Sequence, residues 1–174
     1  IFFDLDKNSD QNTDLPHMLP NKNLWEKILS SMGISNEDNV IIYDNSDLIS
    51  SCRCWYTFIY FGHNPKLVSV LNGGLKKWKL ENRSIDKNTI KINKSSYVAK
   101  ENKDLVKDKK QINENILKKN FKVIDARSKA RFEGKEKEPR EGVRSGSIPN
   151  SYCLPFKELI NENYTFKEKN EISK

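Results

Sequence analysis

The apolar residues of the first half of the chain fall into two alternating patterns. Continuous apolar runs predict strands at residues 1–4, 39–44 and 66–71. Apolar residues three and four positions apart predict helices at residues 21–32 (capped by Asn21 and ended by Gly33), 51–62 and 75–82. This alternation of strands and helices predicts an α/β fold with a mainly parallel sheet, of the doubly wound kind.

A polar stretch follows, and a second group of elements begins after it. The pattern predicts a helix at residues 111–120, a strand at 121–126 and the start of a helix at 155–162. One clear strand cannot close a doubly wound sheet, so we expect the chain to be truncated at both ends and the second domain to be incomplete. The predicted organisation is a first domain at 1–88, a Lys/Asn-rich linker at 89–110 and part of a second domain at 111–174.

The net charge of +7 is concentrated in one place. Residues 90–122 contain ten lysines and four acidic residues, which leaves +6, and Tyr97 is the only aromatic residue before Phe121. Basic surfaces that bind RNA usually interleave lysines and arginines with stacking aromatics. A solvated linker is therefore favoured over a nucleic-acid-binding surface.

Cysteine and histidine are scarce. The three cysteines do not suit a disulfide framework, and Cys52 and Cys54 are too close for a usual bridge or zinc knuckle. We therefore predict a reducing compartment and no structural metal. No apolar run approaches the roughly 20 residues that a transmembrane helix needs, so no membrane association is expected.

Two predicted strands end in loops that could bind an anion, because ligands of open α/β sheets bind at the carboxyl ends of strands. After the strand at 39–44, helix-start N–H groups could bind an anion, although Asp44 places a carboxylate there, as in an ordinary strand–helix turn. After the strand at 121–126, Asp125 could hydrogen-bond the loop. Arg131 and Arg140 could bind a carboxylate, or they could be solvated beside neighbouring glutamates.

Two further residues are candidates for chemistry. His17 lies between two prolines in DLPHMLP, and such a rigid loop could hold an imidazole for proton transfer with Asp6 as its orienting partner. A structural role for this histidine remains an alternative. Cys153 has an apolar setting and no adjacent base, which favours a small buried hydrophobe over a nucleophile.

These motifs, in this order, resemble the two-domain rhodanese superfamily and, within it, the 3-mercaptopyruvate sulfurtransferase branch. The segments that carry the resemblance run almost end to end: FFDLD, DLPHMLP, NVIIYD, VSVLNGGLKKW, VIDARSKARF, EPREG, RSGSIPNS and LPF. Thiosulfate-specific members generally lack the histidine of DLPHMLP and the arginine of EPR, and this chain has both. It departs from the family at Ser147 and Asn150, where GHIPGS is usual.

The resemblance implies a catalytically silent first domain, with Asp44 at the nucleophile's position, and a reactive cysteine on a loop beyond Lys174. That cysteine would take sulfur from 3-mercaptopyruvate as a persulfide and pass it to a thiol such as thioredoxin, or to cyanide, releasing pyruvate. Asp6 and His17 would move the proton, and Arg131 and Arg140 would bind the substrate. No cofactor or metal is implied, and these 174 residues alone are expected to be inactive.

Two other functions remain open. One is transfer of sulfur from thiosulfate, and the other is a non-catalytic binding module that retains the rhodanese fold. The resemblance implies a cytoplasmic or mitochondrial location, and we expect any targeting segment to precede Ile1.

Overall fold

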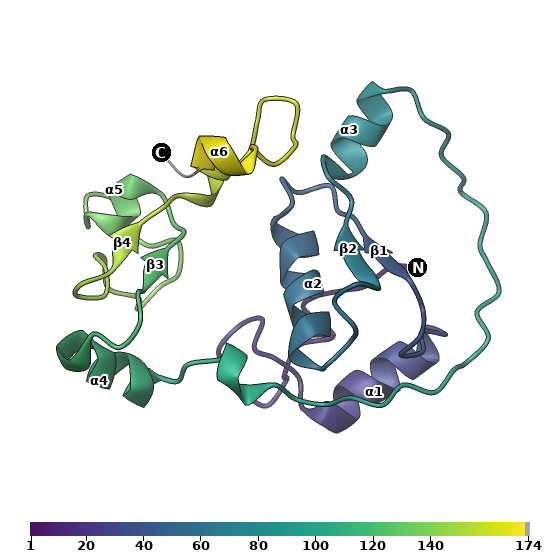
Figure 1. Cartoon of the computed structure of the whole chain (residues 1–174), viewed down its shortest axis with the longest axis horizontal. Coiled ribbons are helices and arrows are strands. Elements are labelled where there is room, and N and C mark those ends of the chain that lie inside the picture. Colours follow the sequence, from purple (N-terminus) through teal and green to yellow (C-terminus); the bar gives the residue numbers. More distant parts are fainter. Residues whose placement is uncertain (173–174) are drawn as a thin grey trace. The chain divides into compact units, whose positions relative to one another are not determined.

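The computed structural model describes residues 1–172, which divide into two compact units, residues 1–106 and residues from 107 onward (Figure 1). The first unit contains helices α1 (Lys22–Ser31), α2 (Ile49–Tyr60) and α3 (Gly74–Leu80), strands β1 (Val40–Ile42) and β2 (Val68–Val70), and the 3-10 turn Lys103–Leu105. Within the described residues, no helix is long and apolar enough to cross a membrane.

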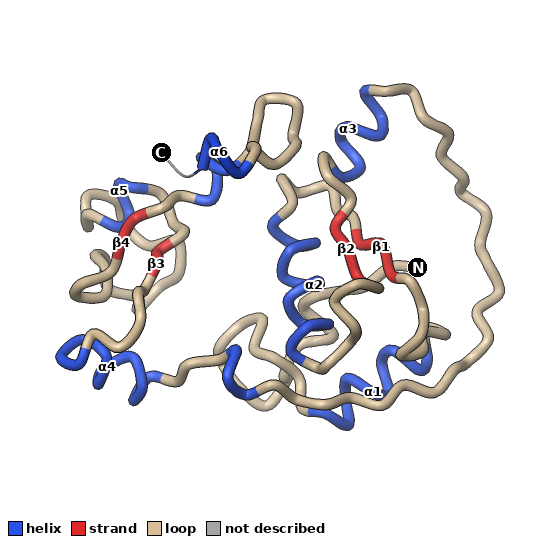
Figure 2. The backbone as a smooth tube through the Cα atoms, viewed as in Figure 1, coloured by secondary structure: helices blue, strands red, loops and turns tan. Residues whose placement is uncertain are grey.

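The sheet of the first unit is a parallel pair in which Val40 lies opposite Val68 and Ile42 opposite Val70. Helix α2 connects the two strands and runs beside them (Figure 2). Parallel strands need such a crossover, so the predicted strand–helix–strand unit is confirmed. Strand β1 is followed directly by the loop that contains Asp44.

Helix α1 begins and ends where the sequence predicts. The side chain of Asn21 accepts a hydrogen bond from the Leu24 N–H at 2.9 Å, as an N-cap does. Gly33 follows the helix with a φ of +72°, a conformation that costs a residue without a Cβ little. The helix buries Trp25, Ile28 and Leu29.

Trp25 is the centre of the core. Its side chain is fully buried, and its ring stacks on Phe61 and meets Phe58 edge to face, both with ring centroids 5.1 Å apart. Phe3 packs against the same ring at 5.8 Å. Aromatic contacts of this kind stabilise a core beyond the effect of burial alone.

The strand predicted at residues 1–4 is not formed. No strand of the described residues pairs with this segment, and a strand without a neighbour lacks the partners for its N–H and C=O groups. The chain instead turns at Asp4, whose carboxylate accepts hydrogen bonds from the N–H groups of Asp6 and Lys7, both at 3.1 Å. Phe3 is partly buried against the core, whereas Ile1 and Phe2 are exposed.

Part of the polar stretch that we expected to be a solvated linker is packed on the first unit. We call residues 95–102 the strap. Three of its backbone N–H groups donate hydrogen bonds of 2.8–3.0 Å to carbonyls of helices α1 and α2 or of the residue after α2. The pairs are Ser95 with Ser30, Lys100 with Phe61 and Asn102 with Tyr60. The expectation of full solvation fails here because Tyr97 and Ala99 enter the core, with 3% and 2% of their surface exposed.

The second unit has short elements and a polar interior. They are helix α4 (Lys109–Lys118), strand β3 (Ile124–Asp125), helix α5 (Lys129–Phe132), strand β4 (Tyr152–Cys153), the 3-10 turn Phe156–Leu159 and helix α6 (Lys169–Ile172). Strands β3 and β4 are parallel, with Asp125 opposite Cys153. The apolar pattern therefore missed β4, and the helix that it predicted from residue 155 is a 3-10 turn.

Replacing Tyr97 with alanine should lower the free energy of unfolding by about 3–5 kcal/mol, because it removes a buried aromatic side chain. The Tyr97 ring stacks on the buried His63 at 5.9 Å, and its hydroxyl lies 3.2 Å from Nδ1 of that residue. Urea unfolding followed by tryptophan fluorescence measures the loss. Tyr43→Ala is the matched control, since Tyr43 is 59% exposed. Equal stability of the two variants would show that the strap is dispensable.

Candidate functional site

The structure brings together the two residues that the sequence predicted for proton transfer. Nε2 of His17 lies 2.6 Å from Oδ1 of Asp6, within hydrogen-bond distance. Nearly half of the His17 side-chain surface is exposed, at 46%, so a reacting group can approach the ring. A structural role for His17 remains the alternative.

The contact with Asp6 sets the tautomer of a neutral His17 ring. An ionised carboxylate can only accept a hydrogen bond, so the proton must be on Nε2. The other ring nitrogen, Nδ1, then carries a lone pair, and no hydrogen bond within the described residues occupies it. The pair is thus arranged to accept or return a proton at Nδ1.

The backbone of His17 is in an unusual conformation. Its φ is +57°, in the left-handed region that residues with a Cβ seldom adopt. Arg53 of α2 contacts this residue, since its Nη2 donates to the carbonyl oxygen of His17 at 2.5 Å. Strained conformations of this kind persist when the surrounding structure enforces them, and they are concentrated at functional sites.

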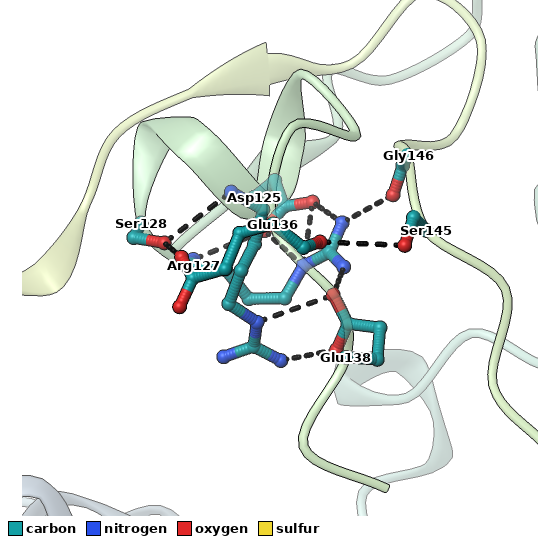
Figure 3. A network of polar contacts seen from close by, with 8 residues as sticks. Asp125, Arg127, Ser128, Glu136, Glu138, Ser145 and Gly146 are labelled. Carbon is teal, nitrogen blue, oxygen red and sulfur yellow. Dashed lines mark hydrogen bonds and ion pairs between the residues drawn. The ribbon is translucent and has the colours of Figure 1, made fainter. Parts of the chain in front are cut away.

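In the second unit, the candidate substrate arginine Arg131 belongs to a network of ion pairs. Figure 3 labels Asp125, Arg127 and Glu138 of this network. The Nε of Arg131 donates to Oε1 of Glu138 at 3.1 Å, and its Nη2 donates to Oε2 of the same carboxylate. Arg127 donates from Nη1 to Oε1 of Glu138 at 2.6 Å and from Nη2 to Oδ2 of Asp125 at 2.5 Å. Asp125 ends strand β3, so the network is attached to the sheet.

The charges in this network stabilise one another. Hydrogen bonds from Arg131 lower the pKa of Glu138, and those from Arg127 lower the pKa of Asp125. The same contacts raise the pKa of both guanidiniums. All four groups are therefore ionised at neutral pH. The alternative of a fully solvated loop does not apply to Glu138, because only 6% of its side-chain surface is exposed.

Arg140 is placed differently. Its side chain is exposed, and no hydrogen bond or ion pair among residues 1–172 engages its guanidinium. Its carbonyl accepts a weak hydrogen bond from the Val143 N–H at 3.4 Å. The structure therefore does not join Arg140 to Arg131, and it leaves the Arg140 guanidinium available to a ligand.

The Asp44 loop already contains its own anion. Oδ1 of Asp44 accepts hydrogen bonds from the N–H groups of Ser46 and Leu48, at 3.0 and 3.3 Å. Oδ2 accepts from the Ser51 N–H, in the first turn of α2, at 2.7 Å. The carboxylate satisfies groups that would otherwise be unpaired at the helix start. The interpretation as a capped strand–helix turn is thus the better one.

The environment of the three cysteines does not favour a thiolate. Burial raises the pKa of Cys54 to about 12. Burial also raises the pKa of Cys52, and the charge of Asp44 adds to that effect. The pKa of Cys153 is raised by burial and then by Asp125. A nucleophilic cysteine needs a lowered pKa, so none of the three is suited to that role.

No group of three His, Cys, Asp or Glu side chains in residues 1–172 is arranged to bind a metal ion. Sequence reasoning missed two parts of the candidate site, Glu138 and Arg53. The EPR motif marks the position of Glu138, but only the fold shows that its carboxylate faces two arginines. Arg53 is separated from His17 by 36 positions, and nothing in the sequence links them.

Comparison with known proteins agrees with this architecture. Residues 7–81 match the family model for the rhodanese-like domain. The chain is 36% identical to the 3-mercaptopyruvate sulfurtransferase of Mus musculus over 99% of its own length and 58% of that protein. It is 35% identical to the Arabidopsis thaliana protein named thiosulfate/3-mercaptopyruvate sulfurtransferase 1, mitochondrial, over 100% of its own length and 51% of that protein.

The crystal structure of SseA from Escherichia coli, described as a 3-mercaptopyruvate sulfotransferase with the rhodanese fold, superimposes with a TM-score of 0.86. The sequence identity is 28%, and the match covers 98% of this chain and 63% of that one. Residues 7–81 thus belong to the rhodanese-like domain family, and the chain has the rhodanese fold. It spans between about half and three fifths of the length of these relatives.

Alkylation should separate the three cysteines from a catalytic one. Iodoacetamide reacts with thiolates, and a raised pKa lowers the thiolate fraction at neutral pH, so all three should react slowly in the folded protein at pH 7. Cys54 should be the slowest, because burial also blocks access. Mass spectrometry of time points, with urea-unfolded protein as the control, gives the rates. Faster reaction of any of them in the folded state would contradict the assignment.

Proposed function

We propose that this chain is part of a sulfurtransferase that takes sulfur from 3-mercaptopyruvate and releases pyruvate. The observation that carries the proposal is the His17–Asp6 pair with an open Nδ1. Removing sulfur from mercaptopyruvate leaves a pyruvate enolate, which must gain a proton. Removing it from thiosulfate leaves sulfite, which is stable without one. A positioned proton-transfer pair therefore favours mercaptopyruvate as the donor.

The reaction has two steps. A cysteine thiolate attacks the substrate's sulfur, the C–S bond breaks, and its electron pair leaves with the carbon as the enolate, so that the enzyme retains a persulfide. A thiol such as thioredoxin, or cyanide, then removes the outer sulfur and restores the cysteine. Neither step needs an external oxidant or reductant, so neither requires a metal or an organic redox cofactor.

The nucleophile lies outside these 174 residues. The raised pKa values of Cys52, Cys54 and Cys153 support this part of the proposal, and so does the greater length of the relatives. In the first domain, Asp44 takes the place that the resemblance gives to the nucleophile. We therefore assign residues 1–88 to a silent domain, 89–110 to a linker of which residues 95–102 pack on that domain, and 111–174 to the start of the catalytic domain, inactive alone.

The arginines supply the binding of the substrate. 3-Mercaptopyruvate carries a carboxylate and an adjacent ketone, both hydrogen-bond acceptors. The exposed guanidinium of Arg140 has no acidic partner within the described residues, and Arg131 presents donors that Glu138 does not use. A guanidinium can donate two parallel hydrogen bonds to a carboxylate, which an ammonium cannot. A cytoplasmic or mitochondrial location is part of the same proposal.

In the full-length enzyme, His17→Ala should lower kcat for 3-mercaptopyruvate about 100-fold, the size expected for losing a general acid–base group. Its melting temperature should stay nearly unchanged, because the ring is half exposed. His63→Ala is the matched control: His63 is 2% exposed and bonds Tyr97, so that variant should lose stability instead. If His17→Ala loses stability while turnover per folded molecule survives, His17 is structural.

In the same enzyme, Arg131→Ala and Arg140→Ala should each raise KM for 3-mercaptopyruvate roughly 10- to 150-fold, since each removes one charge-assisted contact. Arg140→Ala should affect thiosulfate less, because thiosulfate has no carboxylate. Arg144→Ala is the control, as its side chain is exposed and without a contact in the described part of the chain. Arg127 is not a suitable control, since it bonds Glu138.

Three other results would change the assignment. An equal loss in Arg144→Ala would make the loop a general basic patch. Faster turnover with thiosulfate than with mercaptopyruvate would favour a thiosulfate sulfurtransferase. The name of the Arabidopsis relative includes thiosulfate as well. No turnover with either donor in the full-length protein would favour a non-catalytic binding module.

A further inference from the structure

Glu138 is the least exposed acidic group of the arginine network, and it touches both arginines at once. Only 6% of its side-chain surface is exposed, against 27% for Arg127 and for Arg131. Its Oε1 accepts from Nη1 of Arg127 and from Nε of Arg131, and its Oε2 accepts from Nη2 of Arg131. Two guanidiniums would repel each other without the carboxylate between them.

The contact uses one edge of Arg131 and leaves the other open. The Nε–Nη2 edge is bound by Glu138. Within residues 1–172, no hydrogen bond uses Nη1 of Arg131. A guanidinium bound along that edge cannot rotate, so Nη1 points in one fixed direction. A substrate oxygen can be met there without displacing Glu138.

Glu138 is itself fixed from behind. Arg127 bonds both oxygens of Asp125, at the end of β3, and donates to the Gly146 carbonyl at 2.8 Å. The order Asp125, Arg127, Glu138, Arg131 thus leads from the sheet to the candidate substrate-binding group. Each member is charged and paired with a neighbour of opposite sign.

We propose that Glu138 is a positioning residue for substrate binding, which fixes Arg131 along its Nε–Nη2 edge so that Nη1 is directed to the carboxylate or ketone of the substrate. The inference rests on the proposed function, since it assumes that Arg131 binds 3-mercaptopyruvate. Glu138 does not touch the substrate. It removes the rotational freedom that Arg131 would otherwise lose on binding, which is the usual benefit of a preorganised site.

The test uses the full-length enzyme with 3-mercaptopyruvate as the substrate. Glu138→Gln keeps the shape of the side chain but turns an amide N–H toward a guanidinium. It should raise KM roughly 10-fold, the effect of losing one charge-assisted contact, and change kcat much less. Glu138→Asp keeps the charge on a shorter side chain and should give a smaller rise. Glu141→Gln is the matched control, since Glu141 is exposed and has no partner within the described residues.

The double variant Arg131→Ala with Glu138→Gln separates positioning from a general structural role. If Glu138 acts through Arg131, the double variant should have the KM of Arg131→Ala alone, because the two effects are coupled. Multiplied effects would overturn the inference. So would an unchanged KM in Glu138→Gln while Arg131→Ala raises it. If Glu138→Gln does not fold, a wild-type KM in Glu138→Asp with a raised KM in Arg131→Ala also overturns it.

Failure of the proposed function gives a different result. In that case Arg131→Ala leaves KM unchanged, and the inference about Glu138 falls with it. Inhibition by pyruvate provides a second measurement, since pyruvate carries the same carboxylate and ketone. Its inhibition constant should rise in Glu138→Gln by the same factor as KM.

Discussion

The packing of aromatic rings around Trp25 determines where the candidate catalytic residues of the first unit lie. Phe3, on one side of the ring, fixes the chain just before Asp6, and Phe58 and Phe61, on other sides, fix helix α2. Arg53 projects from that same helix to the carbonyl of His17. The contact between His17 and Asp6 therefore depends on two segments that are both anchored on one indole ring. Buried aromatic packing thus positions a polar, exposed pair of residues.

The two units use charge in different ways. In the first, the Asp44 carboxylate is satisfied by backbone N–H groups of its own loop, which closes that loop to other anions. In the second, the carboxylates are satisfied by arginines that retain donors for a further partner. The two loops thus differ in which group neutralises the carboxylate. The Asp44 carboxylate uses the N–H groups of its own loop, so they are not available to another anion. The Glu138 carboxylate instead holds one edge of Arg131 and leaves Nη1 of that guanidinium available.

The sequence predicted the elements whose pattern is local. The cap of α1 at Asn21, its end at Gly33 and the parallel strand–helix–strand unit follow from residues within a few positions of one another, and all are confirmed. It also paired Asp6 with His17, because the prolines restrict the loop and a carboxylate can orient an imidazole. Local patterns failed where pairing decides the outcome. Residues 1–4 are apolar but have no strand to pair with, and residues 152–153 form a strand because β3 lies beside them.

The strap was missed for a related reason. The strap lies within the lysine-rich stretch 90–122, whose average composition predicts solvation, but contacts of a few residues decide its position. Tyr97 and Ala99 are inserted into a core whose nearest member in the sequence, Val68, lies 29 positions before Tyr97. The role of Glu138 was missed because the sequence motif around it is the same whether the glutamate is solvated or buried. In both cases burial depends on the partner, and the partner is distant in sequence.

The glycines at the ends of α1 and α2 have a second use in relation to the strap region. A Cβ at Gly33 would lie 2.6 Å from the carbonyl oxygen of Asn93, and one at Gly62 would lie 2.8 Å from that of Lys100. At both helix ends the glycine therefore allows the backbone of the strap region to approach closely. The distance between these two contact points fixes the number of residues from Asn93 to Lys100. Insertions and deletions among homologues should accordingly accumulate before Asn93 or after Asn102, where the chain has no such register to keep.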